Sequence, residues 1–123
     1  MTWDPAQYER FKAERSRPFH DLLDRVPNGP YQTIADLGCG TGELTGFLRR
    51  RWPAARVWGV DNSASMLEKA RGSAMLRDIT FVDADLLEWT APAPLDLIYS
   101  NAAIHWIPDQ ARLLERLRVA AAP

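Results

Sequence analysis

The sequence predicts an α/β fold in which helices flank one parallel sheet of four strands. Short apolar runs alternate with amphipathic stretches of helical length, a pattern typical of βαβ units. A glycine-rich turn follows the first apolar run, and acidic residues follow the second and the third. The 123 residues suit a single domain, in which we expect an N-terminal helical cap, residues 1–30, and a βαβ core, residues 31–123.

The N-terminal cap is expected to form a helix over residues 4–26. Helical spacing places one set of side chains on a common face and then continues an apolar pattern, namely Tyr8, Phe11 and Arg15, followed by Leu22, Leu23 and Val26. Pro18 is expected to break or restart this helix, because proline lacks an N–H and clashes with the preceding turn. The run PNGP at residues 27–30 then predicts a turn.

The core is expected to contain four strands and three helices. The strands are the apolar runs at residues 33–37, 56–60, 79–82 and 95–100. The first helix follows Gly42, with Leu44, Phe47 and Leu48 facing inward and Arg49, Arg50 and Arg51 near its C-terminal end. The second begins at a Ser63 cap, carries Met66, Leu67 and Ala70, and ends at Gly72. The third spans about residues 109–120.

The fourth strand is expected to be an exposed edge, because the sequence ends where a βαβ pattern would reach its next strand. Its apolar run LIY at residues 97–99 suits a central strand better than an edge. We therefore expect the chain to be a fragment or a truncated product of a larger domain, and to self-associate through that edge.

Composition argues against several classes of protein. The formal net charge of -1 offers no footprint for nucleic acid or for an anionic membrane. No apolar stretch is long enough to cross a bilayer, and the N-terminus does not resemble a signal peptide. The single cysteine, Cys39, cannot form an intrachain disulfide and suits a cytoplasmic location. We assign no metal ligands.

The first functional motif is the run DLGCGTG at residues 36–42, which leaves a strand and leads into a helix. Gly38, Gly40 and Gly42 let the backbone lie against a ligand because they carry no side chain. A dinucleotide site would prefer the spacing G-x-G-x-x-G. The spacing here is G-x-G-x-G with Asp36 before it, which favours a ligand with an amino group over a pyrophosphate. The alternative is a tight turn that binds nothing.

Carboxylates also follow the second and third strands. Asp61 can accept both hydroxyl protons of a ribose, or it can be a turn or cap residue. Asp85 can accept a hydrogen bond from an adenine amino group while the N–H of Leu86 meets a ring nitrogen. Asp83 is the rival for that role, and either aspartate can be a solvated loop residue. Met66 can pack on the adenine or in the core. Because the carboxyl ends of parallel strands share one crevice, the three sites are expected to converge on one ligand.

As a set, these motifs resemble those of the class I S-adenosylmethionine-dependent methyltransferases over almost the whole chain. The run at residues 36–42 is similar to that family's first motif, GVDNS at 59–63 to its ribose motif, and DL at 85–86 to its adenine motif. The resemblance implies a Rossmann-like, partial class I methyltransferase fold with S-adenosylmethionine (SAM) as cofactor. It also implies cofactor contacts from Asn62 and from the backbone near Asn101.

Two further stretches are similar to the trans-aconitate methyltransferases. They are WDP at residues 3–5 with ERSRP at 14–18, and SNAAIHWIPD at 100–109, which also resembles the malonyl-carrier-protein methyltransferases. The resemblance implies that a carboxylate oxygen of a small acid attacks the SAM methyl group. A carboxylate is ionised at neutral pH, so this reaction needs no general base. Family members are about twice as long as this chain, so the resemblance leaves strands five to seven unaccounted for.

The substrate pocket is expected to draw on Tyr8, Arg15, Arg17, His105 and Trp106. Arg15 and Arg17 can grip carboxylates bidentately or form a solvated helix face. His105 is expected to line the pocket rather than act as a base, and Trp106 lines it or packs on the next helix.

Three alternatives stay open: a non-catalytic SAM-binding module, a nicotinamide-dependent oxidoreductase, and a methyltransferase for a carrier-protein thioester or a phenol. The missing strands favour the first, and the glycine spacing opposes the second.

Overall fold

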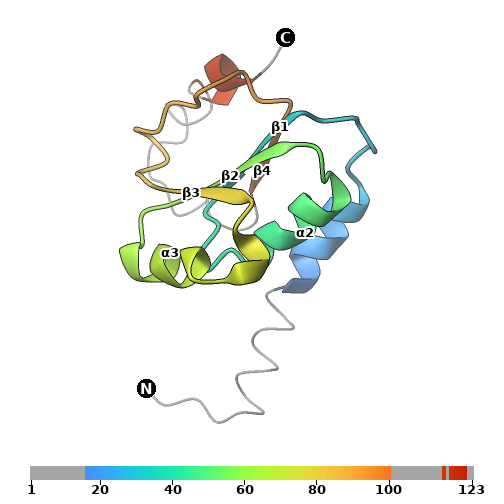
Figure 1. Ribbon diagram of the computed structural model, residues 1–123. Coiled ribbons are helices and arrows are strands. Elements are labelled where there is room, and N and C mark those ends of the chain that lie inside the picture. Colours follow the sequence, from blue (N-terminus) through green and yellow to red (C-terminus); the bar gives the residue numbers. More distant parts are fainter. Residues whose placement is uncertain (1–15, 101–114, 116, 122–123) are drawn as a thin grey trace.

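Four parallel strands form the sheet around which the chain folds (Figure 1). In the computed structural model, which describes residues 16–100, 115 and 117–121, the strand order is β3-β2-β1-β4. The strands are β1 (Thr33–Leu37), β2 (Arg56–Asp61), β3 (Ile79–Asp83) and β4 (Leu97–Ser100). The predicted α/β class and the four strand positions are confirmed, and β4 lies at one edge of the described sheet as expected. Self-association through that edge stays a prediction.

Side-chain alternation divides the core into two layers, one on each face of the sheet. In β1, Ile34 and Asp36 share the face that α2 (Thr45–Arg51) covers, whereas Ala35 and Leu37 share the other face. Every residue of β1 is buried, because both faces of a parallel sheet are covered. The carboxyl group of Asp36 therefore lies on the face of β1 that α2 covers, in the most buried of the four strands.

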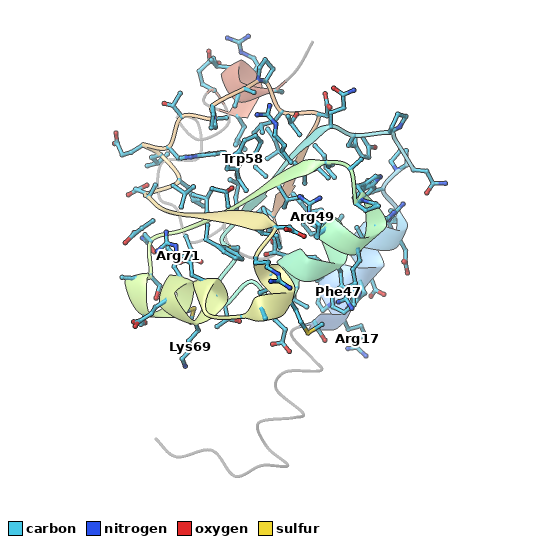
Figure 2. The ribbon with its side chains drawn as sticks, viewed as in Figure 1. Arg17, Phe47, Arg49, Trp58, Lys69 and Arg71 are labelled. Carbon is cyan, nitrogen blue, oxygen red and sulfur yellow. The ribbon has the colours of Figure 1, made fainter. Side chains whose placement is uncertain are left out.

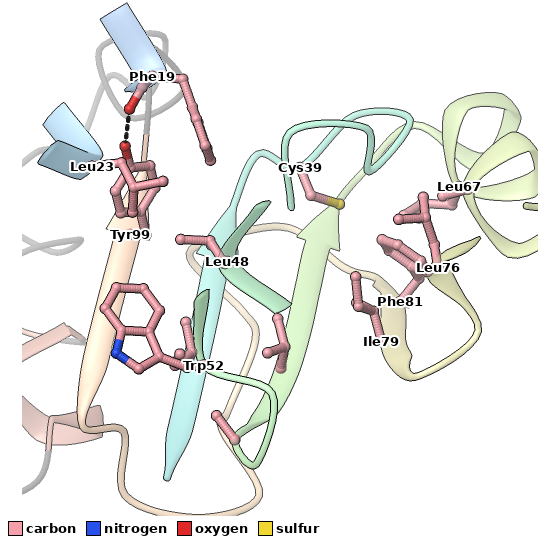
Figure 3. Close-up of a cluster of buried hydrophobic side chains, with 14 residues drawn as sticks. Phe19, Leu23, Cys39, Leu48, Trp52, Leu67, Leu76, Ile79, Phe81 and Tyr99 are labelled. Carbon is pink, nitrogen blue, oxygen red and sulfur yellow. Dashed lines mark hydrogen bonds between the residues drawn. The ribbon is translucent and has the colours of Figure 1, made fainter. Parts of the chain in front are cut away.

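The first layer is made of helices that lie together on one face of the sheet (Figure 1). It contains α2, α3 (Ala64–Arg71), the short 3-10 helix η1 (Ala74–Leu76) and a helical segment at residues 16–24. Figure 3 shows its core, which includes Phe19, Leu23, Leu48, Trp52, Leu67, Leu76, Ile79, Phe81 and Tyr99. The opposite layer packs Leu117 and Ala120, near the C-terminal end of the described residues, against a cluster that includes Trp58 and Val60.

The helical segment at residues 16–24 corrects one prediction and leaves another open. Residues on both sides of Pro18 are helical, and the described residues begin at Ser16, so a restart of the helix before Pro18 stays a prediction. The carbonyl that a proline at this position would leave unpaired belongs to residue 14, outside the described residues. Leu22 is 42% exposed, and the buried face carries Phe19 and Leu23, one helical turn apart, instead.

Polar contacts fasten this segment to the core. The hydroxyl of Tyr99 donates a hydrogen bond to the carbonyl oxygen of Phe19, as Figure 3 shows. The Arg51 guanidinium donates to the carbonyls of Leu23 and Val26, and it lies 4.5 Å from the centre of the Trp52 ring. Arg51 was expected only to favour the C-terminal end of α2 electrostatically, and the structure gives it this additional role.

The cap of α3 supports a specific stability prediction. Ser63 is the N-cap as predicted, and its Oγ accepts a long hydrogen bond of 3.5 Å from the N–H of Met66. Ser63→Ala is expected to lower the free energy of unfolding by about 0.5–1 kcal/mol, the low end for lost caps. Urea denaturation measures this change. Ser73→Ala is the matched control, because Ser73 is the N-cap of η1 without a side-chain cap bond. Equal losses in the two variants would contradict the prediction.

Candidate functional site

The glycine-rich loop turns sharply between β1 and α2. Gly38, Gly40 and Gly42 have φ angles of 80°, 58° and 77°, in the left-handed region that side chains disfavour. The N–H groups of Gly38 and Cys39 both donate to the carbonyl of Val60 in β2, at 2.7 and 3.2 Å. The loop is thus held against the carboxyl end of the neighbouring strand. The positive φ angles give these glycines a backbone role, whereas their predicted close approach to a ligand stays a prediction.

Asp61 closes this arrangement from the end of β2. Its Oδ2 accepts a hydrogen bond of 2.9 Å from the N–H of Gly40, and its Oδ1 accepts one of 2.9 Å from the N–H of Ser63. The carboxylate therefore anchors the glycine loop while it also makes a turn before α3. Each carboxylate oxygen can accept a second hydrogen bond, so both can also receive hydroxyl groups of a ligand.

Asp36 is the buried carboxyl of the site, at 4% exposure. Its Oδ2 accepts a hydrogen bond of 2.7 Å from Oγ1 of Thr45. Burial raises the pKa of Asp36 to about 7, against the opposing effect of the Thr45 bond, and the negative charge of Asp61 adds to the rise. A group in this condition is well suited to pair with a cation, because a buried carboxylate lacks the solvation it would have in water.

A cavity of about 270 Å³ lies between the helical segment at residues 16–24, the glycine loop and the start of α2. Its lining residues are Ser16, Phe19, His20, Asp36, Gly38, Cys39, Thr41, Glu43, Leu44 and Phe47. The rings of Phe19 and Phe47 each meet the His20 ring edge to face, at 5.6 and 4.5 Å between ring centres. The cavity thus combines an aromatic wall with two acidic side chains.

The loop amides are already engaged, which bears on the class of ligand. The N–H groups of Gly38, Cys39 and Gly40 donate to Val60 and Asp61 as described, and that of Gly42 donates to the carbonyl of Cys39 at 3.0 Å. A phosphate would need such N–H groups as donors, and it would also meet the acidic groups of Asp36 and Glu43. The geometry opposes a pyrophosphate at this loop and suits a cationic or neutral ligand.

Of the predicted cofactor residues that the structure describes, only Asp36 and Gly38 line that cavity, so Asp61, Gly40 and Gly42 lie outside it with the residues below. Asp85 is exposed, and its Oδ1 accepts the N–H of Leu87 at 2.8 Å, so it helps to form a turn, while its role at the adenine stays a prediction. Leu86 packs partly buried in the second core layer. Asn62 is exposed at the end of β2, and Met66 is 39% exposed on α3 rather than in the core.

The predicted substrate residues are described only in part. Arg17 is exposed at the start of the helical segment 16–24 (Figure 2) and does not line the cavity. Tyr8, Arg15, His105 and Trp106 lie outside the described residues, and so does Asn101, which was predicted as a cofactor contact.

Sequence reasoning missed Thr45, His20 and Phe47 as parts of the site. A polar residue at a buried position of α2 was the available signal for Thr45. The single cysteine, Cys39, is a free and buried thiol of the glycine loop.

Among the described residues, no group of three or more histidine, cysteine, aspartate or glutamate side chains could hold a metal ion. None of their helices combines the length and apolar character needed to cross a membrane.

Comparison with known proteins gives consistent matches. The family model described as "Methyltransferase domain" matches residues 34–123. A trans-aconitate 2-methyltransferase of Azoarcus sp. is 50% identical over 116 residues, which cover 94% of this chain and 45% of that protein. The chain therefore spans about half the length of the curated relatives that it matches.

Solved structures agree in fold. An S-adenosylmethionine dependent methyltransferase from Mesorhizobium loti superimposes with a TM-score of 0.70 at 35% identity, over 85% of this chain and 49% of that one. The plantazolicin methyltransferase BpumL in complex with SAH gives a TM-score of 0.75 at 20% identity, over 97% of this chain and 50% of that one. At that identity the second likeness concerns the fold alone.

Proposed function

The chain belongs to the methyltransferase-domain family, and from that premise we propose that it binds SAM and transfers its methyl group to a carboxylate of a small acid, with trans-aconitate as the first candidate. The observation that carries the proposal is the glycine loop, which has three glycines of positive φ, begins after the buried Asp36 and is anchored by the Asp61 carboxylate. The name of the 50% identical relative supports the choice of acceptor.

In this proposal each acidic group meets a different part of the cofactor. Asp61 would accept the ribose hydroxyls, because its carboxylate is already oriented by two backbone amides. Asp36 would pair with the amino group of the methionine part in the cavity. Asn62 just after β2, Met66 on α3, and Asp85 and Leu86 after β3 would surround the adenine.

When bound, SAM supplies a methyl group on a positively charged sulfur. The described residues would hold that group and keep water away from it with the aromatic wall of Phe19, His20 and Phe47. An acceptor carboxylate is ionised at neutral pH, so the protein needs to supply orientation rather than a base. Orientation of two reactants can contribute about 7–11 kcal/mol to a rate enhancement. Arg15 and Arg17 would hold the remaining carboxylates of the acid.

A second candidate is a SAM-binding module without catalysis. It is favoured by the described site, because the glycine loop and the cavity account for cofactor binding, whereas Arg17, the described candidate for holding the acid, does not line the cavity. The identity of the acceptor is also part of the proposal. The same cofactor site would serve a methyltransferase that acts on a carrier-protein-bound malonyl group or on another small molecule. A cytoplasmic location belongs to the proposal as well.

Titration of the purified chain by calorimetry tests the cofactor first. S-adenosylhomocysteine (SAH) is expected to bind saturably at one site, whereas NAD is expected to give no heat of binding. Incubation with SAM and trans-aconitate, followed by mass spectrometry, then distinguishes the enzyme from the module by the presence of a methyl ester. Tighter binding of NAD than of SAH would contradict the proposed cofactor.

A further inference from the structure

One buried hydroxyl lies behind the cavity wall without lining the cavity. Thr45 is the first residue of α2, and it is 0% exposed. Its Oγ1 donates the 2.7 Å hydrogen bond to Oδ2 of Asp36, and Asp36 lines the cavity. This bond therefore joins the start of α2 to the wall of the candidate ligand site.

We propose that Thr45 is a positioning residue for ligand binding, whose hydroxyl orients the Asp36 carboxylate and keeps it able to pair with a cationic group. The inference rests on the proposed function, in which Asp36 receives the amino group of SAM. Thr45 itself would not touch the ligand, and its effect would pass entirely through Asp36.

The position of Thr45 suits this role sterically. A threonine side chain is stiff about χ1, and in a helix its hydroxyl commonly bonds to the backbone of the preceding turn. Here the single hydroxyl proton goes to Asp36 instead. Because Thr45 is fixed by its burial at the start of α2, the carboxylate that accepts its bond is fixed as well.

The charges around Asp36 show why such a bond is needed. Three titratable groups interact electrostatically with Asp36, namely Asp61 at the end of β2, Tyr99 in β4 and Cys39 in the glycine loop. Two more line the same cavity, namely His20 in the helical segment 16–24 and Glu43 in the turn before α2. Burial and the charge of Asp61 both favour the protonated form of Asp36, whereas the Thr45 bond favours the ionised form. A protonated carboxyl has no net charge with which to attract an ammonium group.

Two substitutions at position 45 separate the hydroxyl from the shape of the side chain. Thr45→Val keeps the branched shape and removes the hydroxyl, whereas Thr45→Ser keeps the hydroxyl. Carbon-13 NMR follows the carboxyl of Asp36 with pH in the chain without ligand, and calorimetry gives the SAH affinity from pH 5.5 to 8.5. Circular dichroism checks the fold of each variant, and Thr45→Ala replaces Thr45→Val if the valine variant does not fold.

Thr45→Val is expected to raise the midpoint of the Asp36 titration by about one pH unit, since a hydrogen bond to a charged group is lost. SAH binding should then weaken about five-fold at pH 7 and hardly at all at pH 8.5, because affinity follows the ionised fraction. Thr45→Ser should resemble the unaltered chain at every pH. In the Asp36→Asn background, Thr45→Val should no longer change the affinity.

The outcomes that contradict the inference are distinct from those that contradict the proposed function. A folded Thr45→Val variant with an unchanged Asp36 titration and an unchanged affinity profile would overturn the role of Thr45. A uniform loss of affinity at all pH values, unrestored by serine, would also overturn it in favour of a packing role. If the unaltered chain does not bind SAH while the Asp36 titration still responds to Thr45→Val, the proposed function fails and the positioning of Asp36 stands.

Discussion

Asp61→Ala is expected to weaken SAH binding by about 100-fold or more, the largest effect on binding that we expect of a single side chain. The carboxylate would accept two hydroxyl groups of the ribose, and each hydrogen bond to a charged group contributes about 1.5–3 kcal/mol. Two such bonds correspond to at least about two orders of magnitude in affinity. The variant also releases the N–H of Gly40, so the glycine loop loses an anchor. Calorimetric titration with SAH measures the loss.

Asp96→Ala is the matched control for this experiment. Oδ2 of Asp96 accepts a hydrogen bond of 2.7 Å from the N–H of Gln32, just before β1 and therefore at the opposite end of the sheet. Both variants thus lose a carboxylate that binds a backbone amide, but only one carboxylate is next to the glycine loop. Asp96→Ala should bind SAH like the unaltered chain. An affinity of Asp61→Ala within about three-fold of that control would show that Asp61 does not contact the ligand.

Gly42→Ala is expected to destabilise the fold by about 3 kcal/mol. The φ of Gly42 is +77°, and a left-handed conformation costs an L-residue about 1–2 kcal/mol. A Cβ at this position would also lie 2.6 Å from Cζ of Phe81, and overpacking of this kind costs about 1–3 kcal/mol. The melting temperature should fall by about 10 °C or more. A thermal melt followed by circular dichroism measures the change.

The end of α3 provides a control with the same chemical change. Gly72 has a φ of -77°, and a Cβ there would approach no atom closer than 3.4 Å. Gly72→Ala should therefore leave the melting temperature unchanged or raise it slightly, because alanine also restricts the unfolded chain. The penalty of Gly42→Ala should shrink in a Phe81→Leu background, where the ring is absent. A penalty that is the same in both backgrounds would exclude the clash and leave only the backbone strain.

Strand positions were predictable because each strand is a short apolar run followed by a turn residue or an acidic residue. β1 matches its predicted range, and β2 and β3 each extend by one aspartate, Asp61 and Asp83. β4 begins two residues later than predicted, since Leu95 instead makes an isolated bridge to Ala121. Periodicity alone cannot reveal such a contact, because it depends on where the C-terminal helical residues pack.

The candidate site was predictable in its individual residues and less so in their arrangement. The spacing of Gly38, Gly40 and Gly42 pointed to a tight turn between a strand and a helix, and the structure has that turn, but their positive φ angles were not part of the prediction. The bond between Thr45 and Asp36 was missed, because it depends on the path of the whole loop between them. The aromatic wall was missed for the same reason, since His20 meets Phe47 only when a segment before β1 packs beside α2.

The hydrogen bond between Tyr99 and the carbonyl of Phe19 has a consequence for synthesis on the ribosome. Its two residues are 80 positions apart in the chain. At translation rates of about 5–20 residues per second, Phe19 is made about 4–16 seconds before Tyr99 exists. The segment that forms one wall of the cavity therefore stays without this partner until 80 further residues have been made, and its attachment through Tyr99 is completed only after β4 emerges.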